Sequence, residues 1–173
     1  YYNDGEKEGI VFYLDNDVDE GMHGQIVSLI QSETPLQWTS YYNYQCSYVI
    51  PNYVDYGDEI MSYIKKISNW QTKFPAFAWC ATLGDNWYLM DGFAAARLIG
   101  NLWHEGTYEV VNKTLEEKNA TKLFNKGEHY EYWLAGEVSE FDASYYDMYT
   151  DGVRYGSSFN KSDYKYVRAV AKF

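Results

Sequence analysis

Two runs of apolar, largely β-branched residues near the start of the chain are separated by an acidic segment. Residues 9–14 (GIVFYL) and 24–30 (GQIVSLI) have the composition of strands, and residues 15–21 (DNDVDEG) have that of a turn. This pattern predicts an N-terminal β-hairpin. Residues 35–40 (PLQWTS) predict a further short extended segment.

The middle of the chain changes to helical spacing. Ile60, Ile64 and Ile67 recur on one face of residues 58–70 (DEIMSYIKKISNW), and the acidic start suits a helix N-terminus. A second short helix is expected over residues 75–84, because proline favours the first helical turn and glycine stops the helix.

The segment that follows combines a strand, a turn and a helix. Trp87 and Leu89 lie in an extended aromatic stretch and are expected in the core, while Asp91 is expected to cap a helix over residues 93–99. The turn holds no Ser, Cys or Thr, so it is not a catalytic elbow. Residues 109–124 predict another short helix or helix-like turn.

From residue 130 onward the chain alternates aromatic and polar positions. Four such segments, separated by Ser, Asp, Gly and Asn, predict an antiparallel sheet of three or four strands: YEYWLAGEV (130–138), ASYYDMY (143–149), GVRYGSSF (152–159) and YKYVRAVAKF (164–173). Without repeats or linkers, the whole chain 1–173 is expected to be one α+β domain.

The composition changes this picture in two respects. The chain has 20 Tyr, 6 Trp and 8 Phe, which suits either a β-rich fold or a recognition surface, because tyrosine offers a large rigid contact area with a hydroxyl. Its net charge of −11 argues against nucleic-acid and membrane-surface partners, and no apolar run is long enough for membrane insertion. The abrupt start at Tyr1, without a signal peptide, suggests a processed or excised domain.

Candidate catalytic groups are few. The three histidines are His23, His104 and His129, and none lies in a nucleophile–base motif. No zinc-protease, paired Cys-x-x-Cys or P-loop motif occurs, so the chain is not expected to be an enzyme or to hold a cofactor. Cys46 and Cys80 allow a disulfide, and the sequence leaves their pairing open.

The acidic turn partly imitates a calcium loop. Asp15, Asp17 and Asp19 stand at alternate positions, but Glu20 and Ile26 occupy the sixth and twelfth positions, where an EF-hand needs Gly and Glu. A solvated acidic turn is therefore expected, and no metal site is predicted.

Three parts of the chain form a recognisable series: the N-terminal GIVFYLDND…LQW, then FPAFAWCATLGDNWYLMD, and the ending YEYWLAGE…ASYYDMYTDG…NKSDYKYVRAVAKF. In this order they resemble a bacterial domain family of unknown function found on surface proteins of Bacteroides-type bacteria. The family typically has a Cys-containing helix, Gly-Trp-Tyr-Leu-Pro, a second helix, a Tyr-Trp-Ser-Ser-Thr-Glu strand and a Val-Arg-Ala-Val-Arg end. This chain departs from it at Met90, at residues 134–136 and at Ala171, which puts in doubt any function tied to those positions.

The resemblance implies a C-type-lectin-like fold whose termini meet in a hairpin, and which also carries adhesins diversified by retroelements. The calcium-binding signatures of lectins are absent from this sequence. The resemblance further implies that Trp133, Val167 and Val170 belong to the core. Arg168 is then expected to point outward or into an ion pair.

The resemblance to the family also indicates which side chains of the strand at residues 143–149 face inward. Tyr146 and Met148 fall at positions that are apolar in the family and should face inward, so Tyr145, Asp147 and Tyr149 share the opposite face. Further residues are expected to extend this face into an aromatic–acidic ligand-binding patch: Tyr130, Glu137, Glu140, Phe141, Tyr155 and Phe159.

Together these features predict a non-catalytic, adhesin-like module of a bacterial cell-surface or secreted protein. Its ligand would be a glycan or a protein, since aromatic rings and carboxylates suit both. Two alternatives stay open. One is a relative of the formylglycine-generating oxidases, which would use Cys46 and Cys80, and the other is a purely structural cap or spacer of a surface fibre.

Overall fold

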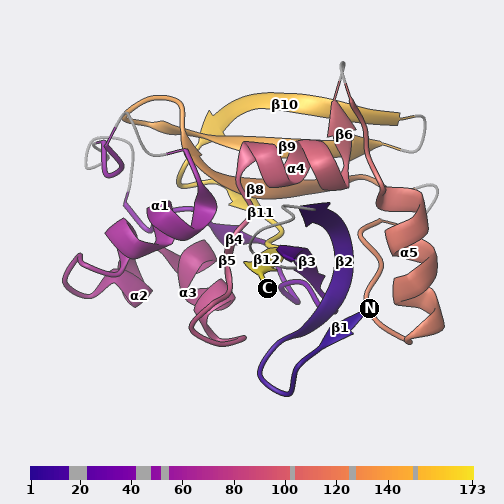
Figure 1. Ribbon diagram of the computed structural model, residues 1–173. Helices are drawn as coiled ribbons and strands as arrows, with labels where there is room; N and C mark the ends of the chain where they lie inside the picture. Colours follow the sequence, from indigo (N-terminus) through magenta and orange to yellow (C-terminus); the bar gives the residue numbers. More distant parts are fainter. Residues whose placement is uncertain (16–22, 42–47, 52–54, 102–103, 125–127, 150–151) are drawn as a thin grey trace.

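The computed structural model describes residues 1–15, 23–41, 48–51, 55–101, 104–124, 128–149 and 152–173. Five strands form the first sheet, in the order β1-β2-β3-β12-β5 (Figure 1). They are β1 (Tyr2–Asn3), β2 (Glu8–Asp15), β3 (His23–Ser28), β12 (Ala169–Lys172) and β5 (Tyr88–Leu89). Strands β2 and β3 pair antiparallel, which confirms the predicted N-terminal hairpin.

The end of the chain returns to this hairpin. Strand β12 pairs with β3, with Ala171 opposite Ile26, and with β5, with Ala169 opposite Leu89. The ring of Phe173 lies 4.3 Å from that of Tyr2, centroid to centroid. The last of the four alternating segments therefore completes the N-terminal sheet instead of adding a fourth strand to the C-terminal one.

The second sheet has three antiparallel strands, in the order β10-β9-β8. These are β8 (Tyr130–Glu137), β9 (Asp142–Tyr149) and β10 (Gly152–Asn160). The α+β class, with its C-terminal antiparallel sheet, is confirmed. Two short pairs complete the strands: β4 (Leu36–Gln37) with β11 (Tyr164–Lys165), and β6 (Gly100–Asn101) with β7 (His104–Glu105).

The described helices occupy the middle of the chain. They are α1 (Gly57–Ile64), α2 (Trp70–Lys73), α3 (Pro75–Ala81), α4 (Gly92–Leu98) and α5 (Tyr108–Glu117). The helix predicted over residues 58–70 ends at Ile64. Turns follow it, and α2 begins after Asn69, which has a left-handed backbone conformation with φ of 58°. None of the described helices is long and apolar enough to cross a bilayer.

Helices join the two sheets. Helix α4 contacts β2 of the first sheet and β8 of the second, and α1 contacts β5 and β8 (Figure 1). Asp91 fixes both helices: its carboxylate accepts from the backbone N–H of Ala94 at 2.8 Å and of Gly57 at 2.9 Å. The predicted cap is confirmed, and because Asp91 is 2% exposed it also ties together the starts of α1 and α4.

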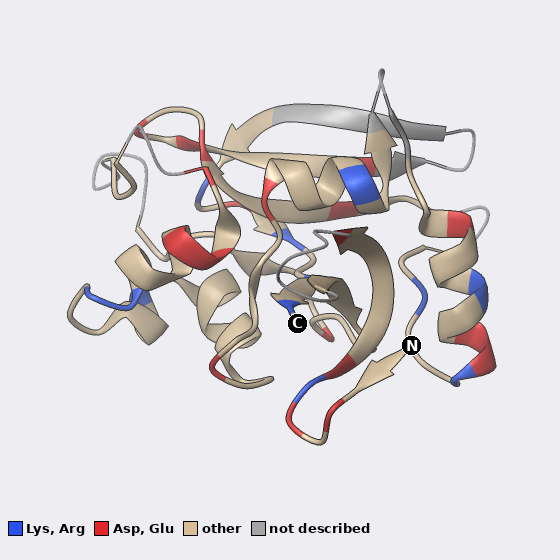
Figure 2. Ribbon diagram, viewed as in Figure 1, with Lys and Arg blue, Asp and Glu red and all other residues tan. Residues whose placement is uncertain are grey.

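The core contains the residues that the sequence placed there. Trp87, Leu89, Trp133, Val167 and Val170 are all buried. Charged side chains are spread over the turn between β1 and β2, the first turn of α1 and α5 (Figure 2).

Arg168 departs from its prediction, which was wrong. It is fully buried, and its Nη2 donates to the carbonyl of Ser28 at 2.6 Å. No described carboxylate pairs with it, and burial lowers the pKa of its guanidinium to about 10. The reason is its position at the crossover, where the chain leaves the edge of β8 at Tyr166 and enters the other sheet at Ala169.

Candidate ligand-binding surface

One face of the C-terminal sheet gathers aromatic and charged side chains. Glu131 lies opposite Asp147, and Trp133 opposite Tyr145, so these four share a face. Tyr146 points the other way and is fully buried, as predicted. The side chains of its neighbours Met148 and Tyr149 lie outside the described residues.

Lys165 holds two aromatic rings on this face. Its Nζ lies 3.9 Å from the ring centroid of Tyr145 and 4.1 Å from that of Phe159. It also donates to Glu131 Oε2 at 2.9 Å, and its side chain is 1% exposed. A desolvated ammonium attracts aromatic faces strongly, so Lys165 fixes both rings from beneath. The ring of Phe159 remains available, because this residue is 46% exposed.

The two rings meet edge to face. The centroids of Tyr145 and Phe159 are 5.9 Å apart, and the ring planes are inclined by 73°. Their place on one face follows from the register of β10, where Phe159 lies opposite Ala143, two residues before Tyr145. The result is a rigid aromatic pair with one well-exposed member.

Beside the aromatic pair lies a group of polar side chains. His129 Nε2 is 2.5 Å from Asp147 Oδ1, and one ligand atom each from His129, Glu131 and Asp147 lie within 4.8 Å of one another. These three could hold a metal ion, but the ammonium of Lys165, 2.9 Å from the carboxylate of Glu131, opposes a second cation. Hydrogen bonding to polar groups of a ligand suits this charge arrangement better.

The turn between β8 and β9 adds exposed apolar side chains at the other end. Ser139 Oγ accepts from the N–H of Phe141 and of Asp142, at 3.1 and 3.0 Å, and so closes the turn. Phe141 is 42% exposed, and Val138 is 52% exposed. Glu140 is exposed in the same turn.

Glu137, although predicted as a member of the patch, lies beneath the surface. Its carboxylate is 4% exposed and accepts from the N–H of Val49 at 2.9 Å and of Ile50 at 2.7 Å. It also pairs with Lys161 Nζ at 2.6 Å, and the side chain of Lys161 is 1% exposed. This arrangement fastens the segment around Val49 to the sheet and leaves the carboxylate little contact with solvent.

The two remaining tyrosines occupy different positions from the aromatic pair. Tyr130 lies opposite Met148, on the face that carries Tyr146, and its ring is 6.2 Å from that of Tyr132 and nearly parallel to it. Tyr155 lies opposite Tyr146 in the ladder, and its side chain is outside the described residues.

The structure therefore brings together three of the predicted residues, Tyr145, Asp147 and Phe159, with Glu140 and Phe141 at the turn. It adds three that the sequence analysis missed: His129, Glu131 and Lys165. Their positions follow from the register between β8 and β9 and from the return of β11, which alternation within one strand does not reveal.

Cys80 bears on the oxidase alternative. It is fully buried, and burial raises the pKa of its thiol, which keeps it protonated and unreactive. Cys46 lies outside the described residues, as do Asp17 and Asp19 of the acidic turn.

Comparison with known proteins gives a structural relationship but no match by sequence. No protein-family model matches the sequence, and no curated protein matches it either. The fold is similar to that of a fimbrial protein from Bacteroides ovatus ATCC 8483, with a TM-score of 0.65 and 15% sequence identity. The match covers 99% of this chain and 46% of that protein, so this chain has the fold of about half of the fimbrial protein.

Proposed function

We propose that this chain is a non-catalytic, adhesin-like module of a Bacteroides-type cell-surface or secreted protein, and that it binds a glycan. The binding site would be the aromatic–acidic surface, defined as Glu131, Tyr145, Asp147 and Phe159, with Glu140 and Phe141 at its rim. The fold shared with a fimbrial protein supports the surface location. A C-type-lectin-like classification and retroelement diversification stay predictions from the sequence.

The observation that carries the proposal is the fixed aromatic pair beside two carboxylates. A sugar ring stacks its C–H groups on an aromatic face, and its hydroxyls donate to carboxylate oxygens. Phe159 supplies an exposed face, and Glu131, whose side chain is 31% exposed, supplies an acceptor on the same side of the sheet. Asp147 is 8% exposed and lies against His129, so it supports the site from below the surface. Because Lys165 already holds the rings in place, binding would cost little side-chain entropy.

Glycan and host-protein arrays, each probed with and without EDTA, test this function. We expect saturable binding to glycans that survives EDTA and that falls at least about tenfold in a Phe159→Ala variant. Tyr164→Ala is the matched control, because Tyr164 is 65% exposed on β11 and lies outside the aromatic–acidic surface.

Each other outcome has a definite meaning. Binding to proteins alone would replace the glycan by a protein partner. Binding lost in EDTA would indicate a cation held by His129, Glu131 and Asp147, against the argument from Lys165. Absence of binding on every array would favour the structural cap or spacer.

A further inference from the structure

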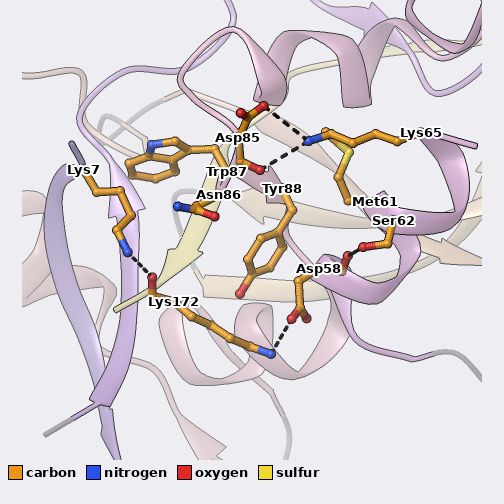
Figure 3. Close-up of a pocket in the computed structure, with 10 residues that line it drawn as sticks. All are labelled: Lys7, Asp58, Met61, Ser62, Lys65, Asp85, Asn86, Trp87, Tyr88 and Lys172. Atoms are coloured by element: carbon orange, nitrogen blue, oxygen red, sulfur yellow. Dashed lines mark hydrogen bonds and ion pairs between the residues drawn. The ribbon is translucent and has the colours of Figure 1, made fainter.

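A second concave site lies away from the aromatic–acidic surface. It is a pocket of about 300 Å³ between the β1–β2 turn, α1, the loop before β5, and β12 (Figure 3). None of its ten described lining residues belongs to β8, β9 or β10. Its volume is at the lower end of the range for small-molecule sites.

Three lysines from distant parts of the sequence converge here. Lys7 donates to the carbonyl of Lys172 at 2.9 Å, Lys172 pairs with Asp58 at 2.7 Å, and Lys65 donates to the carbonyl of Asp85 at 3.3 Å (Figure 3). Three ammonium groups thus face two carboxylates, in a chain whose acidic residues outnumber its basic ones by 25 to 14. The lining residues by themselves therefore carry one more positive than negative charge, and the nearest further carboxylate, that of Asp4, lies 4.0 Å from Lys7 Nζ.

Lys7 is the least neutralised of the three. Its closest described carboxylate oxygen belongs to Asp4, 4.0 Å away, and its side chain is 15% exposed. An ammonium has three N–H donors, and the described contacts of Lys7 include one hydrogen bond, to the carbonyl of Lys172. An anionic group of a ligand would complete this arrangement with charge-assisted hydrogen bonds.

The same pocket offers groups for neutral hydroxyls. The side chain of Asn86 makes no hydrogen bond to any described residue, and it provides both a donor and an acceptor at the centre of the pocket (Figure 3). The carboxylate of Asp85 is fully exposed and only 3.8 Å from Lys65 Nζ, so it retains acceptor capacity. Trp87 and Tyr88 close the wall behind them.

We propose that this pocket binds an acidic sugar, with the sugar carboxylate at Lys7 and its hydroxyls at Asn86 and Asp85. A ligand that carries an anion and several hydroxyls matches the charge excess and the free polar groups together. A neutral sugar would leave the excess charge unmatched, and a simple carboxylate would leave Asn86 and Asp85 unused. The proposal does not depend on the aromatic–acidic surface.

Titration of the isotope-labelled chain with glucuronate, glucose, acetate and oligogalacturonate tests it by NMR. We expect saturable shifts of the amides of Lys7, Asn86 and Trp87 with the uronates, and weaker binding as salt is raised. Lys7→Gln should weaken glucuronate binding about tenfold. Lys65→Gln provides a second variant, and thermal melts check that both fold.

Lys113→Gln is the matched control, because this α5 lysine is 78% exposed and does not line the pocket. Equal binding of monomer and oligomer would identify a free acid, and preference for the oligomer a polysaccharide. Absence of saturable shifts with either uronate, equal affinity for glucose or acetate, or unchanged affinity in both variants would overturn the proposal. Phe159→Ala should leave these shifts unchanged. Failure of the pocket proposal can therefore be distinguished from failure of the proposed glycan binding at the aromatic–acidic surface.

Discussion

The burial of Glu137 leads to a stability prediction that separates an internal role from a ligand contact. Replacing Glu137 by Gln keeps the volume and one acceptor oxygen, but it removes the negative charge 2.6 Å from Lys161 Nζ. The ammonium of Lys161 is 1% exposed, so solvent cannot replace the lost charge. The variant also places an NH2 group among the N–H donors of Val49 and Ile50.

The magnitude follows from the burial of both partners. Removing one member of a buried ion pair costs about 3–5 kcal/mol, and the retained acceptor oxygen places this case near 3 kcal/mol. In a chain of 173 residues, 1 kcal/mol corresponds to about 2–4 °C in the melting temperature. Thermal unfolding followed by circular dichroism should therefore show a decrease of about 6–12 °C for Glu137→Gln.

Glu140→Gln is the matched control in the same turn. Glu140 is exposed, and its backbone carbonyl, not its carboxylate, accepts from Lys161 at 2.8 Å, so this variant should melt within about 2 °C of the native chain. Adding Lys161→Met to Glu137→Gln removes the uncompensated charge and should recover part of the loss. If Glu137→Gln melts like Glu140→Gln, the buried pair does not stabilise the fold as argued.

Three further perturbations test the core and its electrostatics. Trp87→Ala removes a buried indole and should lower the free energy of unfolding by about 3–5 kcal/mol in denaturant titrations, and a loss below about 1 kcal/mol would contradict its core role. Asp91→Ala frees two buried N–H groups, those of Ala94 and Gly57, and should cost about 2–4 kcal/mol in the same assay, whereas an unchanged midpoint would refute the double cap. Burial raises the pKa of the Tyr88 phenol, so the unfolded chain releases this proton at a lower pH than the folded chain, and stability should fall as the pH rises above about 10. Thermal melts from about pH 9 to 11 should show a shallower fall for Tyr88→Phe than for the native chain, and an equally steep fall would contradict this argument.

The sequence was sufficient to predict those elements whose buried side depends only on residues within the same segment. The apolar spacing of α1 predicts buried Ile60 and Ile64, and the aspartate before α4 predicts its cap. Alternation along β9, in the phase that the family resemblance implies, places Tyr146 inside, and this residue is fully buried. In each case, the signal and its structural consequence lie within a few residues of one another.

The sequence could not predict the face or the burial of residues whose surroundings come from distant segments of the chain. Tyr130 falls on the far face of the sheet because β8 pairs with β9 in a register that only the folded sheet defines. Glu137 is buried because a segment about 90 residues earlier in the chain covers it, as the bonds from Val49 and Ile50 show. Arg168 is interior because the chain crosses between two sheets at that residue.

The direct test of the aromatic–acidic surface compares the native chain, Phe159→Ala and Tyr164→Ala side by side on one glycan array. Both substitutions remove an exposed aromatic ring, but only Phe159 belongs to the surface, in contact with Tyr145 and Lys165. The account predicts that binding falls at least about tenfold for Phe159→Ala and is retained for Tyr164→Ala. Equal binding by all three chains would contradict it.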